Sequence, residues 1–175
     1  MTARLLAIGD IHGCDVALDA LLDQMQPTAE DILVTLGDYV DRGPNSRGVI
    51  DRLIDLGTQT NLVAIKGNHE EMMIEVLHRG GNHNDWLKYG GDKTMTSYDF
   101  CGSLDCIPAD HHRFLENLGD YFVHDSYFFT HAAYEPQVPL EYQSAGFLRW
   151  HSLEDGIPGP HQSGLTAVVG HTANK

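Results

Sequence analysis

Side chains that bind divalent cations follow five short apolar runs of the sequence. Each run is followed, after one or two intervening residues, by Asp, Asn or His, and carboxylate, amide and imidazole groups are ligands for first-row metals. Because the carboxyl ends of parallel strands open on one side of a sheet, these side chains should meet there. Mixed oxygen and nitrogen ligands indicate a catalytic metal site and suit Mn²⁺, Fe²⁺ or Zn²⁺. The predicted ligands are Asp10, His12, Asp38, Asn68, His131 and His171.

Asp38 stands in the middle motif and is the candidate to bridge two cations. Two divalent ions about 3.5–4 Å apart can clamp a phosphoryl oxygen and activate a water molecule for in-line attack. Hydrolysis of a phosphoester is therefore the chemistry that this ligand set predicts. Histidines away from the predicted strand ends are expected to be ordinary surface or core residues. They are His78, His83, His111, His112, His124 and His161.

Three consecutive strand–helix units carry the first four ligands. Apolar runs at residues 5–8, 32–36 and 62–65 predict buried strands, and a third helix is expected over residues 70–77. Three such units predict a parallel sheet with right-handed crossovers. The apolar faces of the first two helices are Leu18, Leu21, Leu22 and Met25, then Val49, Ile50, Leu53 and Ile54.

The second half of the chain has a less regular pattern. Residues 80–118 are rich in Gly, Asn and Asp, and predict an irregular helical insertion that starts where Gly80-Gly81 interrupts the third helix. Apolar runs at residues 121–123 and 127–129 predict a hairpin, and residues 166–169 predict one more buried strand. The expected fold class is α/β.

The composition is that of one globular unit. The 175 residues are 42% hydrophobic and 21% charged, so we expect a single domain over residues 1–175. A net charge of −14 argues against a nucleic-acid polymer as partner. The start of the chain is too poor in apolar residues for a signal peptide or membrane span, which favours a cytoplasmic protein without a membrane partner. The three cysteines form no CxxC pair and are expected to be reduced structural thiols; the oligomeric state stays open.

Five motifs occur in order: GDIHG at residues 9–13, GDYVDRG at 37–43, GNHE at 67–70, HA at 131–132 and GH at 170–171. With these motifs the chain resembles the calcineurin-like metallophosphoesterases. Within that family it is most similar to the bacterial and phage serine/threonine phosphoprotein phosphatases, because the DRG of the second motif and the GNHE of the third are intact. The resemblance implies a β-sandwich of two mixed sheets flanked by α-helices.

The resemblance also divides the predicted ligands between two divalent metal ions. Asp38 would be shared by both ions, as its central place suggests. Mn²⁺ is the first expectation, with Fe²⁺ and Zn²⁺ as alternatives, and a metal-bound hydroxide would attack the phosphorus directly. One ion would be held by Asp10, His12 and Asp38, and the other by Asp38, Asn68, His131 and His171.

Other motif residues would act on the substrate. The resemblance implies that Arg42 binds phosphate oxygens with its planar fork, together with Asn68 and His69. His69 would protonate the leaving alkoxide, with Asp41 keeping the ring oriented and charged. Arg149, between the fourth and fifth motifs, is the candidate for a second phosphate-binding arginine. A helix-capping or surface role is the alternative for Arg149.

These residues are compatible with three functions. The leading expectation is a phosphatase for phosphoserine or phosphothreonine in proteins and for small phosphoesters. A symmetrical dinucleoside tetraphosphate hydrolase is the nearest alternative, but its second motif tends to lack the equivalent of Asp41, and its third tends to end in Asp rather than Glu. A non-catalytic scaffold for phosphorylated partners belongs to another class, and the intact set of ligands argues against it. Substrate choice is expected to reside mainly in residues 80–118.

The printed chain stops at Lys175, directly after the fifth motif, whereas members of the family usually continue with further strands. We therefore expect a C-terminally truncated domain with an unpaired sheet edge and with His171 near a fraying end. Binding of the second cation is then expected to be weaker than in a longer form.

Overall fold

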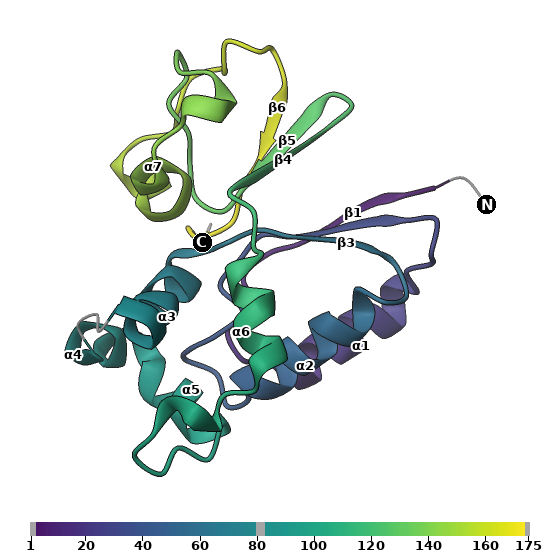
Figure 1. Ribbon diagram of the computed structural model, residues 1–175. Helices are drawn as coiled ribbons and strands as arrows, with labels where there is room; N and C mark the ends of the chain where they lie inside the picture. Colours follow the sequence, from purple (N-terminus) through teal and green to yellow (C-terminus); the bar gives the residue numbers. More distant parts are fainter. Residues whose placement is uncertain (1–2, 80–82, 174–175) are drawn as a thin grey trace.

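The computed structural model describes residues 3–79 and 83–173 (Figure 1). It contains two three-stranded sheets, one from each half of the chain. Helices cover one face of the first sheet, and the second sheet packs against the opposite face (Figure 1). Strands, helices and the two sheets form the mixed α/β fold that the motifs predict.

The first sheet is parallel throughout its described strands, which are ordered β1-β2-β3. The strands are β1 (Leu5–Ile8), β2 (Ile32–Thr35) and β3 (Asn61–Ala64), and they are followed by the helices α1 (Asp15–Met25), α2 (Ser46–Leu56) and α3 (Asn68–Arg79). In the central strand β2, Leu33 and Val34 are both fully buried, because successive side chains face the helices and the second sheet in turn. The three predicted strand–helix units are confirmed.

Helices α1 and α2 each bury an apolar face in the main core. Leu18 and Leu22 of α1 are buried, whereas Leu21, predicted on the same face, is 42% exposed. The side chain of Asn45 caps α2 by accepting a hydrogen bond from the Gly48 N–H at 3.0 Å. Each fully buried aliphatic side chain contributes about 1.5–3 kcal/mol. The buried apolar face of α2 consists of Val49, Ile50, Leu53 and Leu56.

The second sheet is mixed, as the resemblance implies, whereas the described strands of the first sheet, also expected to be mixed, pair only in parallel. Strands β4 (Tyr121–His124) and β5 (Tyr127–Thr130) form the predicted antiparallel hairpin, and β6 (Thr166–Val168) pairs parallel with β5. A second core cluster lies between the sheets, where Phe129 packs with Val34, Leu36 and Ile65 of the first sheet. This cluster joins the two sheets into a sandwich and brings the end of β5 to the carboxyl ends of the first sheet.

Short helices fill most of the segment predicted as an irregular insertion. They are α4 (His83–Trp86), a π-helical turn (Leu87–Gly91), α5 (Asp92–Ser97), a 3₁₀ turn (Leu104–Cys106) and α6 (Ala109–Glu116). Gly90 interrupts the helical path with a φ of 104°. The predicted break at Gly80-Gly81 lies outside the described residues. Beyond the hairpin come two 3₁₀ turns (Leu140–Tyr142 and Leu153–Asp155) and α7 (Ala145–Trp150).

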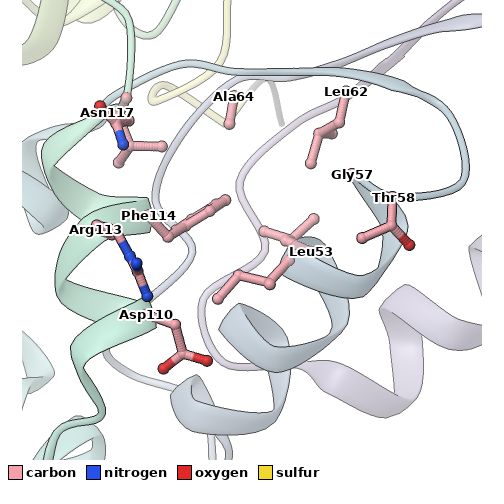
Figure 2. Close-up of a pocket in the computed structure, with 11 residues that line it drawn as sticks. Leu53, Gly57, Thr58, Leu62, Ala64, Asp110, Arg113, Phe114 and Asn117 are labelled. Carbon is pink, nitrogen blue, oxygen red and sulfur yellow. The ribbon is translucent and has the colours of Figure 1, made fainter.

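A cavity of about 510 Å³ lies between α2, β3 and α6 (Figure 2). Leu53, Leu62 and Phe114 give it apolar walls, and Asp110 and Arg113 of α6 stand at its side (Figure 2). None of the predicted metal or phosphate ligands lines this cavity. The site must therefore be sought at the ends of the strands.

The three cysteines are free, as predicted. Their expected role as packing residues is wrong for two of them, because Cys14 and Cys101 are exposed. Cys14 stands at the start of α1 and donates a weak hydrogen bond from Sγ to the His12 carbonyl at 3.4 Å. Across residues 3–79 and 83–173, no helix has the length and apolar character needed to cross a membrane.

Candidate metal and phosphate site

The loops that follow the strands hold several site residues in a left-handed backbone conformation. Among non-glycine residues this conformation is uncommon, costs of order 1–3 kcal/mol each, and clusters at functional sites. The φ values are 45° for His12, 53° for Asp38, 70° for Asp41, 66° for Arg42 and 62° for His171. The backbone conformation that orients these side chains therefore lowers the stability of the fold.

Glu70 holds the loop that carries Asp38. Its fully buried carboxylate accepts hydrogen bonds from the backbone N–H groups of Asp38 at 2.8 Å, Tyr39 at 2.7 Å, Val40 at 3.2 Å and Gly67 at 3.0 Å. A side chain at Gly67 would collide with Asp38, since an added Cβ would lie 2.2 Å from Oδ1. The sequence analysis assigned no role to Glu70, although its position in the GNHE motif could have indicated one.

We predict that Glu70→Gln lowers both stability and metal affinity. The amide would offer one acceptor instead of two and would turn a donor toward buried N–H groups, at a cost of about 1–3 kcal/mol. Urea denaturation and titration with Mn²⁺ measure the two effects. Glu75→Gln is the matched control, because Glu75 lies exposed on the same helix. Equal stability and equal metal affinity in the two variants would contradict this role of Glu70.

His12 presents an unpaired ring nitrogen to Asp38. Its Nδ1 lies 3.0 Å from the Val40 carbonyl and must donate there, so Nε2 carries the lone pair. That Nε2 is buried without a hydrogen-bond partner among the described residues and lies 3.4 Å from Asp38 Oδ2. Burial lowers the pKa of His12, and burial, with the charges of Glu70 and Asp10, raises the pKa of Asp38 to about 9.

His131 presents its ring in the same way on the other side of Asp38. Nδ1 donates to the Leu36 carbonyl at 2.6 Å, which leaves Nε2 as the acceptor. Nε2 lies 3.1 Å from Asn68 Oδ1, 3.1 Å from His171 Nδ1 and 3.4 Å from Asp38 Oδ1. Burial lowers the pKa of His131 to about 4. Two acceptor atoms, His131 Nε2 and Asn68 Oδ1, thus face each other at close range.

The side chains around His12 and those around His131 are each suited to bind a divalent cation. Lone pairs of buried nitrogen and oxygen atoms repel unless a proton or a metal ion lies between them. His12 and His131 also donate their Nδ1–H to backbone carbonyls, which is how metal-binding histidines are usually oriented. Among the residues that the structure describes, two groups of side chains could hold an ion: His12, Asp38 and His69, and Asp38, His131 and His171. Asp38 belongs to both groups, in keeping with its predicted bridging role.

Asp10 and His69 also lie beside these groups. Asp10 is exposed; its Oδ1 accepts a hydrogen bond from the His171 backbone N–H at 2.9 Å, and its charge contributes to the raised pKa of Asp38. His69, predicted only to act on the substrate, belongs to the first group, with Nε2 3.9 Å from Asp38 Oδ2. The assignment of Asp10 to a cation therefore stays a prediction.

Arg42, His69 and Asp41 form a connected row beside these groups. His69 Nδ1 donates to Asp41 Oδ2 at 2.7 Å, and His69 Nε2 accepts from Arg42 Nη2 at 3.0 Å. The predicted contact between Asp41 and His69 is therefore present. The predicted charge on His69 is wrong for this arrangement, because burial and the Arg42 guanidinium lower its pKa to about 3, while burial raises the pKa of Asp41 to about 7.

Two residues missed by sequence reasoning, Trp86 and Thr94, also bond the Asp41 carboxylate. Trp86 Nε1–H lies 3.0 Å from Oδ1 and 2.9 Å from Oδ2, and the Thr94 hydroxyl donates to Oδ1 at 2.7 Å. Both residues come from the segment predicted to carry substrate choice. Their buried polar groups, spaced along irregular helices, gave no sequence signal for this contact.

Arg149 makes a different set of contacts from those expected. Its guanidinium donates to Glu71 Oε1 at 2.5 Å and also bonds Asp120, so it joins α7 to α3 and to the start of the second sheet. The residue is only 9% exposed, which excludes the surface role considered as the alternative. The next residue, Trp150, bonds the ring of His171 through its backbone. Binding of phosphate by Arg149 stays a prediction.

This strand-end site and the two-sheet fold are those of a known class. The chain belongs to the calcineurin-like phosphoesterase family, whose model matches residues 3–174. The family assignment made from the five motifs is confirmed, and with it the general class of metallophosphoesterase hydrolase.

Relatives within the family are named either serine/threonine-protein phosphatases or symmetrical bis(5'-nucleosyl)-tetraphosphatases. The chain is 41% identical over 90 residues to serine/threonine-protein phosphatase 2 of Escherichia coli K12, a match that covers 51% of this chain and 39% of that protein. It is 41% identical over 75 residues to the symmetrical bis(5'-nucleosyl)-tetraphosphatase of Paracidovorax citrulli, which covers 42% of this chain and 26% of that protein. The chain thus matches less than half the length of these curated relatives.

One solved structure resembles nearly the whole chain. The crystal structure of "a putative diadenosine tetraphosphatase" superimposes with a TM-score of 0.69 at 23% sequence identity, covering 98% of this chain and 80% of that one. At this identity the likeness establishes the shared fold only.

Proposed function

We propose that this chain is a dinuclear-metal phosphatase that hydrolyses phosphate monoesters, with phosphoserine and phosphothreonine in proteins as its main substrates. The main observation is that the Nε2 atoms of His12 and His131 face the two oxygens of Asp38, with Arg42 and His69 next to them. Family membership supports metal-dependent phosphoester hydrolysis, and the phosphatase relatives support the choice of substrate.

The proposed roles follow from the contacts of each side chain. Arg42 turns its guanidinium toward the site and would bind two phosphate oxygens. A phosphate that draws this guanidinium away from His69 Nε2 removes a positive neighbour and adds negative charge, and both changes raise the pKa of His69. His69 can then hold a proton at Nε2 for the leaving oxygen, while Asp41 accepts from Nδ1. Asn68, 4% exposed at the start of α3, would bind phosphate as well as metal.

The metal ligands would be Asp38, shared between the two ions, with Asp10 and His12 on one side and Asn68, His131 and His171 on the other. When bound, two divalent cations supply Lewis acidity and make water a better nucleophile at neutral pH. They would also make the site locally positive within a chain of net charge −14. Mn²⁺ is the first ion to test, followed by Fe²⁺ and Zn²⁺, because all three suit mixed oxygen and imidazole ligands.

A symmetrical dinucleoside tetraphosphate hydrolase is the second candidate, and relatives of that name favour it. Two residues support the phosphatase instead. Asp41 bonds the ring of His69, and Glu70 holds the loop of Asp38 with a side chain long enough to reach four backbone N–H groups. Both are positions at which the resemblance expects the tetraphosphate hydrolases to differ.

A direct comparison of substrates tests the proposal. The full chain, loaded with Mn²⁺, is assayed on a phosphoserine peptide for released phosphate and on diadenosine tetraphosphate for ADP. We expect a higher kcat/KM for the peptide, and loss of both activities on chelation. The reverse order would establish the tetraphosphate hydrolase. No turnover of either compound with Mn²⁺, Fe²⁺ or Zn²⁺ would point to a non-catalytic scaffold.

A further inference from the structure

The carboxylate of Asp41 is enclosed by hydrogen-bond donors from a distant segment of the chain. Asp41 and Thr94 are fully buried, and Trp86 is 1% exposed. Oδ1 accepts from the Thr94 hydroxyl and lies within reach of Trp86 Nε1, while Oδ2 accepts from His69 Nδ1. The Asp41 backbone N–H lies 2.8 Å from Thr94 Oγ1 and 3.0 Å from Ser46 Oγ. Both the backbone and the side chain of Asp41 are therefore held.

These contacts fix which atom of Asp41 faces the His69 ring. Rotation of the carboxylate would break the short Thr94 bond to Oδ1 and leave buried donors without partners, which costs about 1–3 kcal/mol for each group. Because the Arg42 guanidinium only donates hydrogen bonds, His69 Nε2 is the acceptor, and the ring proton lies on Nδ1, where Asp41 Oδ2 accepts it. The orientation of Asp41 thereby directs Nε2 of His69 toward Arg42 and Asp38.

The same segment also contacts the other two members of the row. The Arg42 backbone N–H donates to the Gly90 carbonyl at 3.3 Å, and an added Cβ at Gly90 would lie 2.6 Å from that nitrogen. The ring of Tyr89 meets the edge of His69 with the ring centroids 6.4 Å apart. Residues 83–97 therefore contact all three members of the row. Trp86 and Thr94 contact Asp41. Gly90 contacts Arg42, and Tyr89 contacts His69.

We propose that residues 83–97 position the proton-donating His69, with Trp86 and Thr94 as positioning residues that act through Asp41. This inference rests on the proposed phosphatase function. It adds a role for the segment that does not depend on contact with the substrate. Neither residue touches the phosphate or a metal; each holds the carboxylate that orients the ring.

A merely structural role predicts a different pattern of kinetic effects. If Trp86 and Thr94 only stabilise the fold, their loss should affect every substrate alike. If they orient a general acid, the loss should grow with the basicity of the leaving oxygen, because a poor leaving group needs the proton and a good one does not. The choice of substrate therefore separates the two explanations.

The experiment compares two phosphoesters in the full chain with Mn²⁺. Trp86→Phe removes the N–H and keeps a ring, and Thr94→Val removes the hydroxyl and keeps the shape. We expect kcat for a phosphoserine peptide to fall by about 10- to 100-fold in each variant, less than the full 10²–10⁴-fold of general acid catalysis. For para-nitrophenyl phosphate we expect a fall of less than about threefold, with KM and metal content unchanged.

Two further variants serve as controls. Tyr98→Phe removes a buried hydrogen bond of the same segment, to His111 Nδ1 at 2.8 Å, away from Asp41. It should lower stability without changing the ratio of the two activities. Thr94→Ser keeps the hydroxyl and should restore turnover of the peptide, so the test does not depend on the Trp86 variant folding.

Equal losses on both substrates, or the same substrate ratio in Tyr98→Phe as in Thr94→Val, would overturn the positioning role. That outcome leaves the phosphatase assignment standing, because the wild-type chain would still hydrolyse both esters. A wild-type chain that hydrolyses neither ester contradicts the proposed function itself, and the positioning role falls with it.

Discussion

Replacing Asp38 by asparagine should remove metal-dependent turnover from this chain and with it the binding of both cations. Asp38 Oδ2 faces His12 and Asp38 Oδ1 faces His131, so one substitution weakens both groups of ligands. An amide contributes no negative charge and only one oxygen. Loss of an outer hydrogen-bond partner of a metal site costs about 10- to 100-fold in affinity or activity, and loss of the shared ligand should exceed that.

Two measurements check this expectation. Elemental analysis after dialysis against Mn²⁺ gives the metal content, and thermal unfolding with and without Mn²⁺ gives the stabilisation by bound ions. Wild type should gain thermal stability with Mn²⁺, and Asp38→Asn should not. Asp23→Asn makes the same change at an exposed position on α1 and should behave as wild type. Retention of two ions by Asp38→Asn would exclude the bridging role.

The substitution His69→Asn should slow turnover by about 10²–10⁴-fold, the usual contribution of general acid catalysis, while metal content stays the same. His69 is fully buried between Asp41 and Arg42, and asparagine cannot carry a proton to the leaving oxygen. The loss should appear in kcat for a phosphoserine peptide, because that leaving group is poor.

The metal content of the His69 variant distinguishes its two roles. His69 also belongs to the first group of side chains that could hold an ion. A fall from two ions to one per chain would make His69 a ligand and would contradict its assignment as the acid. His78→Asn is the matched control, since His78 lies exposed on the same helix and pairs with Glu116.

Most of the fold could be predicted because short-range patterns encode it. Apolar runs of four or five residues, each followed by a helix, predict a parallel first sheet, and β1, β2 and β3 lie within a residue of the predicted runs. The site followed from the same rule, since ligands collect where parallel strands end. Asp38, Asn68, His131 and His171 meet as this rule predicts.

The features that escaped prediction depend on contacts between residues far apart in the chain. Trp86 and Thr94 reach Asp41 across 45 and 53 positions, and no periodicity marks such a pair. The neutral state of His69 depends on its burial beside Arg42, which motifs alone do not reveal. The hydrogen bond from the His171 backbone N–H to Asp10 Oδ1 follows from the backbone path of the last loop.

The contact between Asp10 and His171 spans 161 positions of the sequence. A nascent chain therefore carries its earliest site residues long before it can assemble them with the latest. Ions in the cell meet only fragments of the ligand set until the final strand is synthesised and folded. We therefore expect hydrolytic activity to appear only late in synthesis. Translation products that end before His171 should not hydrolyse phosphoesters.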